Sequence, residues 1–229
     1  MCGRAYSTYT AEELEMRYLN KRRIKLASSP LKPNYNFSPT QLAPVVFMKD
    51  SQITIELMRW GLVPSWAKSI QDASKYSLIN AKGEEITEKR SYKNAFKSRR
   101  CIVPLSGFFE WHREENGPKR PYAIHLRDGG IMSLAGIWEH WKSAETGDEI
   151  HSFTVITTTP NSVMEKIHNR MPVILDSKDE QDWLNPENQD TKSLQTLLKP
   201  CPSSWITAYE ISTMVNSPRN NKAEILNPI

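Results

Sequence analysis

The segment APVVFMKDSQITIELMRW, residues 43–60, decides the fold class of this chain. Ala43 to Phe47 and Ile53 to Trp60 form two apolar runs that are separated by a short polar turn. In the second run Ile53, Ile55 and Leu57 alternate with polar residues, which is the pattern of a half-buried strand. The segment therefore predicts an antiparallel β-hairpin.

Other short apolar runs predict further strands, which outnumber the predicted helices and do not alternate regularly with them. The strands are expected at Cys101–Val103, Gly107–His112, Tyr122–Leu126, Ile131–Trp138 and His151–Thr158. Helices are expected at about Thr10–Asn20, Glu84–Lys97, Thr159–His168, Asp176–Leu184 and Asp190–Leu198, and an irregular extended loop at Pro30–Pro39. This order favours an α+β fold with a curved, largely antiparallel, barrel-like sheet flanked by short helices.

The composition is that of a soluble globular protein, with 38% hydrophobic and 24% charged residues. No linker divides the 229 residues, so a single domain over 1–229 is expected. No apolar run is long enough for a membrane span, and the N-terminus has no secretory apolar core. The wide spacing of Cys2, Cys101 and Cys201 fits neither disulfides nor zinc. We therefore expect a cytoplasmic protein, nucleoid-associated if bacterial, with no metal and no cofactor.

Basic residues gather in two clusters, although the net charge is only +4. The first is Lys21–Lys25, and the second runs from Lys89 to Arg100 with Tyr92 and Phe96 interleaved. Basic residues with aromatics suit a groove that follows phosphates and stacks on bases. A solvated helix face accounts for either cluster equally well.

Cys2 directly follows the initiator methionine. Loss of Met1 places a free α-amine and a thiol on adjacent carbons. An α-amine is less basic than a lysine amine, so part of it is nucleophilic near neutral pH. It condenses with an aldehyde to an imine, and the thiol closes this to a stable thiazolidine ring. The simpler interpretation is a small second residue that merely permits methionine removal.

Three further polar residues stand in distinctive surroundings, and none of them identifies a site alone. Asn80 lies in Ile79-Asn80-Ala81-Lys82, next to a probable strand. Glu110 stands among aromatics in Gly107–Trp111, where burial raises a carboxyl pKa toward that of a general acid; an outer strand face is the alternative. His168 ends a predicted helix, as a proton shuttle or a structural residue.

Taken together, these segments resemble the SOS response-associated peptidase (SRAP) family, whose members process abasic sites. The resemblance spans nearly the whole chain and keeps the family's order. It is carried by MCGR at the terminus, Asn36 to Pro39, Trp60–Trp66, Ile79–Ala81, Cys101–Pro104 running into Gly107–Trp111, Ile167–Pro172, Val215-Asn216 and Ala223–Leu226.

The resemblance implies that loss of Met1 exposes Cys2, which bonds to the aldehyde of an abasic site in single-stranded DNA. It implies that Asn80 orients the reacting groups, that Glu110 is the acid–base residue and that His168 assists sugar ring opening. The DNA-binding residues expected on this basis, or as stacking aromatics, are Arg4, Asn36, Pro39, Trp60, Trp66, Lys82 and Arg170. We expect a monomer.

The chain departs from the family at two positions where arginine is common. Lys82 follows Ile-Asn-Ala, and Met171 follows Arg170. Lysine keeps the charge but loses the bidentate fork that guanidinium offers to phosphate. Two other function classes stay open at this point: an N-terminal-cysteine peptidase or amidase acting on other substrates, and a DNA-binding module without chemistry.

Overall fold

The hairpin predicted at residues 43–60 lies at the centre of the computed structural model, which describes residues 2–20, 31–114 and 117–229. Its arms are β3 (Leu42–Lys49) and β4 (Gln52–Trp60), paired antiparallel from Leu42↔Arg59 to Lys49↔Gln52. The predicted hairpin is confirmed, but the predicted burial of Leu57 is wrong, because its side chain is 41% exposed. Met58 and Trp60 are buried instead, since they point into the sheet's interior.

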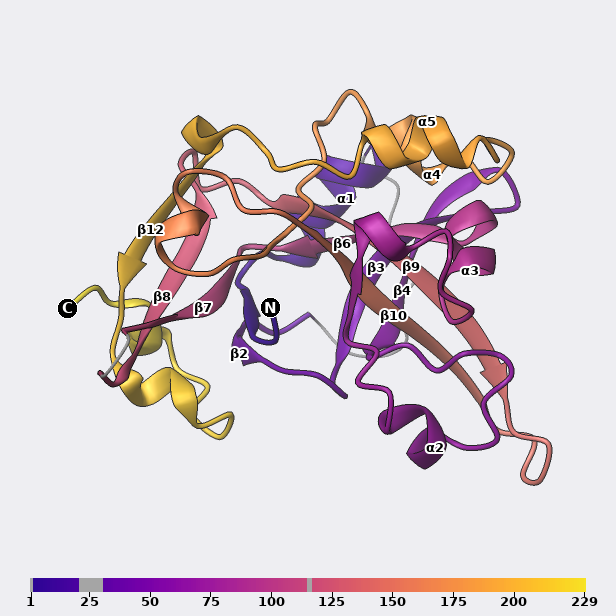
Figure 1. Cartoon of the computed structure of the whole chain (residues 1–229), viewed down its shortest axis with the longest axis horizontal. Coiled ribbons are helices and arrows are strands. Elements are labelled where there is room, and N and C mark those ends of the chain that lie inside the picture. The colour runs from indigo at the N-terminus through magenta and orange to yellow at the C-terminus, as the bar shows by residue number, and fades with distance from the viewer. Residues whose placement is uncertain (1, 21–30, 115–116) are drawn as a thin grey trace.

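The hairpin is part of a sheet that closes on itself (Figure 1). Five strands form the ring, in the order β10-β4-β3-β6-β9 and back to β10. The remaining members are β6 (Arg100–Leu105), β9 (Met132–Lys142) and β10 (Glu149–Thr158), with β5 (Asn80–Lys82) and β11 (Met171–Pro172) added along β10. Among the described strands, only the β4–β10 and β5–β10 pairs are parallel. The expected curved, largely antiparallel, barrel-like sheet is confirmed.

A second, antiparallel sheet packs beside the barrel, in the order β12-β8-β7-β1-β2. Its strands are β1 (Ala5–Ser7), β2 (Asn34–Phe37), β7 (Gly107–Arg113), β8 (Lys119–Leu126) and β12 (Ile206–Glu210). β2 corrects the prediction of an irregular loop at Pro30–Pro39, because β1 pairs with it through Ala5↔Phe37. Figure 1 shows the N-terminal segment in the middle of the molecule, between this sheet and the barrel.

The helices are short. They are α1 (Ala11–Leu19), α2 (Ile70–Ser74), α3 (Lys93–Ser98), α4 (Glu180–Leu184) and α5 (Thr191–Thr196), with 3-10 turns η1 (Gly83–Glu85), η2 (Met164–Lys166), η3 (Ser203–Trp205), η4 (Thr213–Asn216) and η5 (Ala223–Leu226). The capping box of α1 is confirmed, since Thr10 and Glu13 exchange hydrogen bonds of 2.7 and 3.2 Å. None of the helices in the described part of the chain is long and apolar enough to cross a membrane.

Two helix predictions are wrong in extent. The predicted helix Glu84–Lys97 is η1 followed by turns and then α3. The predicted helix Thr159–His168 contains only η2, because the side chain of Asn161 accepts hydrogen bonds from the backbone N–H groups of Val163 and Met164 and forms a local turn instead.

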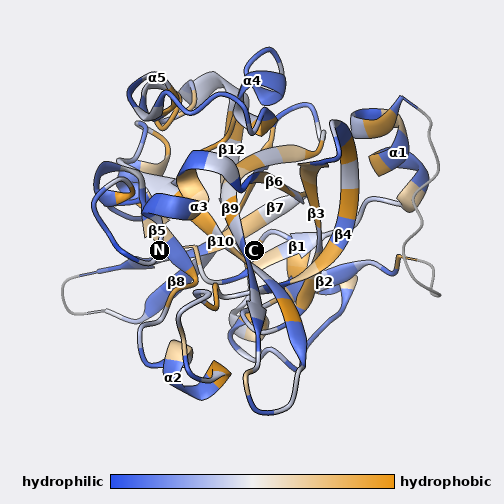
Figure 2. Ribbon diagram, turned by 90° about the vertical axis from the view of Figure 1, so that its right-hand side faces the viewer, coloured by the Kyte–Doolittle hydropathy of each residue, from blue (hydrophilic) through white to orange (hydrophobic). Residues whose placement is uncertain are grey.

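Apolar residues fill the interior of the barrel and cover part of its outer surface. One buried cluster occupies the barrel interior and continues toward the second sheet, where it includes Cys2, Trp60 and Phe108. Another lies between the outside of the barrel and helices α1, α3, α4 and α5. Figure 2 shows the apolar residues concentrated on the barrel strands, while the surrounding loops are mostly hydrophilic. Cys2 thus sits where the two sheets meet.

Candidate functional site

Cys2 is held against the core just before the start of β1. Its side chain is 1% exposed and belongs to the same buried cluster as Phe37, Trp60 and Phe108. β1 is paired on both sides, with β2 and with β7, so the backbone that leads back to Cys2 is fixed in position. Burial raises the pKa of the Cys2 thiol far above its ordinary value, and the Glu110 carboxylate raises it further. The thiol is therefore neutral near pH 7.

Asn80 reaches Cys2 from the barrel. It starts β5, which pairs with β10 through Asn80↔Val155, and its Nδ2 donates a hydrogen bond of 2.7 Å to the carbonyl oxygen of Cys2. Tyr92 Oη donates to the carbonyl oxygen of Asn80 over 3.2 Å, and Trp60 Nε1 donates to that of Ile79 over 2.9 Å. Asn80 Oδ1 is buried and accepts no hydrogen bond from the described residues. An unused acceptor therefore lies beside Cys2.

Glu110 reaches the same place from the second sheet. It lies on β7, whose Phe108 pairs with Ala5 and whose Phe109 N–H donates to the carbonyl oxygen of Arg4 over 2.9 Å. Since β1 and β7 are antiparallel, the residues after Phe109 run beside those that precede Arg4. The Glu110 side chain is 3% exposed, so the predicted burial is confirmed and the alternative of an exposed outer strand face is excluded.

His168 follows η2 and is half-buried. Its Nδ1 lies 3.0 Å from the backbone nitrogen of Arg170 and 3.3 Å from the carbonyl oxygen of the same residue, so the backbone of Arg170 orients the ring. Ile167 and Met171, on either side of this segment, belong to the same buried cluster as Cys2. The four predicted catalytic residues thus come from four separate segments that are attached to one continuous core.

Arg170 is not a free cation in this structure. Its guanidinium forms a two-pronged ion pair with Glu84, with both N···O distances 2.8 Å, and also donates to the carbonyl oxygen of Thr157 over 2.7 Å. This ion pair lowers the pKa of the Glu84 carboxyl. No local pattern indicates Glu84 as the partner of Arg170, because 86 residues separate the two in the chain.

The side chain of Asn36 holds two segments of the chain together, and its predicted contact with DNA stays a prediction. The residue is 1% exposed. Its Oδ1 accepts from Arg4 Nη1 over 2.8 Å, and its Nδ2 donates to the carbonyl oxygens of Val215, Ser217 and Asn220 over 3.3, 2.9 and 2.7 Å. Every polar atom of this amide is therefore occupied. Arg4 Nη1 also donates to Val215 O over 2.7 Å, so the two side chains fasten the segment after β12 to the backbone next to Cys2.

The ring of Trp60 is 1% exposed and stacks on Phe37 at 5.1 Å, which fits core packing. Its stacking on a neighbouring base stays a prediction. Trp66 is half-buried, with Arg90 over its ring at 4.7 Å. Pro39 is half-buried and Lys82 is exposed, with Lys82 Nζ 3.3 Å from Glu85. These three positions remain predictions as DNA contacts.

The basic cluster Lys89–Arg100 does not form the predicted stacking groove. Tyr92 and Phe96 are buried in the cluster under the helices. Arg100 is buried too, and its guanidinium donates to five backbone carbonyl oxygens, including that of Trp183 at 2.7 Å. The other cluster, Lys21–Lys25, lies outside the described residues.

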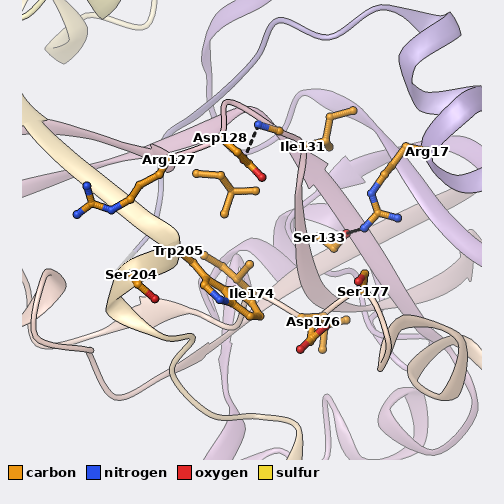
Figure 3. A pocket seen from close by; sticks show the side chains of 13 residues that line it. Arg17, Arg127, Asp128, Ile131, Ser133, Ile174, Asp176, Ser177, Ser204 and Trp205 are labelled. Atoms are coloured by element: carbon orange, nitrogen blue, oxygen red, sulfur yellow. Dashed lines mark hydrogen bonds between the residues drawn. The ribbon is translucent and has the colours of Figure 1, made fainter.

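The described residues contain no group of three or more histidine, cysteine or acidic residues placed to hold a metal ion. A cavity of about 480 Å³ lies elsewhere, between the β8–β9 turn, η3 and α1 (Figure 3). Figure 3 shows Arg17 and Arg127 on opposite sides of it, with Trp205 and Ile174 between them. None of the predicted site residues lines this cavity.

The fold and the site define an α+β protein whose second residue, a cysteine, is held beside a buried glutamate and an asparagine amide. The family model described as "SOS response associated peptidase (SRAP)" matches residues 1–218, and the chain belongs to this family.

Characterised relatives and a solved structure support this assignment. The chain is 41% identical over 194 residues to the abasic site processing protein YoqW of Bacillus subtilis, with 85% of each chain covered. It is 35% identical over 228 residues to the abasic site processing protein HMCES of Xenopus tropicalis, covering 87% of this chain and 67% of that protein. A crystal structure of a protein from Bacteroides thetaiotaomicron superposes with a TM-score of 0.86 at 31% identity, covering 98% of this chain and 99% of that one.

Proposed function

We propose that this protein processes abasic sites in single-stranded DNA by forming a covalent thiazolidine crosslink through Cys2 after Met1 has been removed. The observation that carries the proposal is the 2.7 Å hydrogen bond from Asn80 to the Cys2 carbonyl oxygen, next to the buried Glu110, in a chain of the SRAP family. The names of the relatives, abasic site processing proteins, support the substrate.

Removal of Met1 is the hydrolysis of one peptide bond. It consumes one water and releases free methionine, leaving an α-amine on Cys2. We assign the acid–base role to Glu110, because its carboxylate acts electrostatically on Cys2. Asn80 holds the carbonyl oxygen of Cys2 itself rather than that of the bond to be cleaved, so its role is to fix the residue's backbone.

Crosslink formation then proceeds in two steps, which require no redox partner. The α-amine attacks C1 of the ring-opened sugar, and one water leaves as the imine forms. The Cys2 sulfur adds to the same carbon, and its proton passes to the nitrogen. Because the thiol is neutral in this buried position, the amine is the first nucleophile and the thiol needs a base nearby, which Glu110 supplies.

Asn80 Oδ1 and His168 complete the assignment. The unused Oδ1 acceptor suits the new α-amine or a hydroxyl of the opened sugar. His168, whose ring is oriented by the backbone of Arg170, is assigned to proton transfer at the sugar ring oxygen as the ring opens. Turning an abasic residue out of the strand costs less unstacking energy than turning out an intact nucleotide. Undamaged DNA also has no aldehyde, so both the ease of extrusion and the reaction itself favour an abasic site.

The test is a crosslinking assay with protein that lacks Met1 and an oligonucleotide carrying one abasic site, analysed on a denaturing gel. The wild type is expected to form one slower-migrating species, which Cys2→Ala abolishes. Cys201→Ala is the matched control, because it removes another buried thiol and leaves Cys2 in place. A stable crosslink in Cys2→Ala, or none in the wild type, rejects the proposal. Equal binding of intact and abasic strands without a covalent species indicates a binding module instead.

A further inference from the structure

A small cavity of about 150 Å³ lies next to the candidate site, because Ile79, which lines the cavity, is the residue before Asn80. Trp60 and Ile79 both line it, and the hydrogen bond between Trp60 Nε1 and Ile79 O connects its wall to the residue before Asn80. Thr40 forms part of its rim, directly after Pro39, and its N–H donates to the carbonyl oxygen of Trp60 over 2.9 Å. The cavity is therefore built from the same segments that position Asn80.

The cavity has a buried apolar wall and an exposed polar rim. Leu62 and Leu78 are buried in the wall, whereas Thr40 and Ser77 at the rim are exposed. An exposed rim gives access from solvent. A ligand with an apolar face and a polar edge fits such a lining, whereas a phosphate group, which is charged on all sides, does not.

Arg59 brings a positive charge to this cavity without a matching carboxylate. Its Nη1 donates to the carbonyl oxygen of Gly61 over 2.8 Å, and no carboxylate pairs with it among the described residues. Partial burial lowers the pKa of its guanidinium. Gly61 has φ +111°, and a Cβ there would lie 3.0 Å from Arg59 Nη1, so glycine leaves the room that the guanidinium occupies. Among the described residues, the one acceptor that this guanidinium contacts is the Gly61 carbonyl oxygen, which engages Nη1 and leaves donors for a ligand.

We propose that this cavity binds the pyrimidine base of a nucleotide next to the abasic residue, with Arg59 donating to a carbonyl oxygen of the base. The inference rests on the proposed function. A cavity of roughly 150 Å³ in another protein holds one benzene molecule, so the volume suits a single six-membered ring and not a purine. Pyrimidines present carbonyl oxygens, and guanidinium offers donors only.

The experiment uses protein that lacks Met1 and single-stranded oligonucleotides with one abasic site. The neighbour on each side in turn is thymine, adenine or a baseless tetrahydrofuran spacer, which keeps the phosphate. We expect thymine on one of the two sides to give the fastest initial crosslinking, by about tenfold over the spacer if the base contributes as stacked bases do. Adenine on that side is expected to behave like the spacer.

Two variants and a control connect any preference to the cavity. Arg59→Met removes the donors, and Ala73→Leu fills the space; each is expected to bring the thymine rate down to the spacer rate. Arg127→Met removes an arginine at the larger cavity and is expected to keep the preference. Crosslinking by the wild type that does not depend on either neighbour overturns the pocket but not the proposed function. A preference that survives in both folded variants also overturns it. No crosslink with any oligonucleotide rejects both.

Discussion

The side-chain amide of Asn80 donates a hydrogen bond of 2.7 Å to the carbonyl oxygen of Cys2, although 78 residues separate them in the chain. Asn80 lies on β5, which pairs with β10 of the barrel, and Cys2 lies just before β1 of the other sheet. This bond therefore joins the two sheets at the site. In the proposed function, this bond holds the backbone of the residue that supplies the amine and the thiol.

Replacing Asn80 by alanine is expected to slow single-turnover crosslinking by about tenfold to a hundredfold, because the buried carbonyl oxygen of Cys2 loses its donor and an unsatisfied buried group costs about 1–3 kcal/mol. Asn188→Ala, which removes an exposed amide bonded to Asp182, is the control and is expected to react at the wild-type rate. An unchanged rate in a folded Asn80→Ala protein would contradict the assigned role.

Glu110→Gln is expected to retain Met1, because the variant keeps the size of the side chain but loses the base for hydrolysis. Intact-mass spectrometry of the purified protein measures this directly as the presence or absence of one methionine residue. Glu139→Gln, which changes another buried carboxylate, one that is paired with Arg99, is expected to lose Met1 normally. Complete processing of Glu110→Gln would show that a cellular aminopeptidase removes Met1.

Glu84→Gln is expected to tighten binding to single-stranded DNA several-fold, because Glu84 now occupies the guanidinium of Arg170 that a phosphate would otherwise contact. The slope of log K against log salt is expected to steepen by about 0.7, the value for one more phosphate contact on a single strand. Glu187→Gln changes the net charge equally at an exposed position and controls for long-range attraction. Weaker binding by Glu84→Gln would mean that Glu84 orients Arg170 for DNA.

Alkaline pH is expected to destabilise the fold. Burial raises the pKa of the Cys101 thiol well above its ordinary value of 9.0, so above about pH 9 the unfolded chain ionises first and the free energy of unfolding falls. Below that pH this contribution is fully present. Denaturant unfolding at pH 7 and pH 10.5 is expected to show a smaller loss in Cys101→Ala than in the wild type. An equal loss in both would exclude this thiol as a cause.

Local patterns predicted the parts of the fold that depend on neighbours in sequence. The hairpin β3–β4 and the Thr10 cap were correct, because alternation and capping act within a few residues. β2 was missed because its partner is β1, which no local signal connects to a proline-rich segment. The pattern predicts Leu57 to be buried together with Ile55 on the outer face of β4, but the helices cover only part of that face, so Ile55 is buried and Leu57 is exposed.

The candidate site shows the same contrast between local sequence signals and contacts between distant segments. The sequence offered Cys2, Asn80, Glu110 and His168 as candidates, and the structure attaches their segments to one core. The sequence alone does not show that the side chains of Asn36 and Trp60 make internal contacts, because a residue's type does not tell whether it contacts the protein or a ligand. Nor could it indicate Glu84, Tyr92 or Arg59, whose roles arise only from contacts that folding creates.

The clamp made by Arg4 and Asn36 sets an order of events during biosynthesis. Arg4 donates a hydrogen bond to the carbonyl oxygen of Val215, which is translated 211 residues later. Asn36 also donates to that carbonyl oxygen, so its bond forms equally late. While the ribosome is still making the second half of the chain, the backbone next to Cys2 has no clamp to fix it. If the protein removes its own Met1 and this step needs the fixed backbone, the step follows synthesis of residue 220, whereas an enzyme that trims nascent chains acts earlier. The timing of methionine loss on the ribosome therefore distinguishes the two routes.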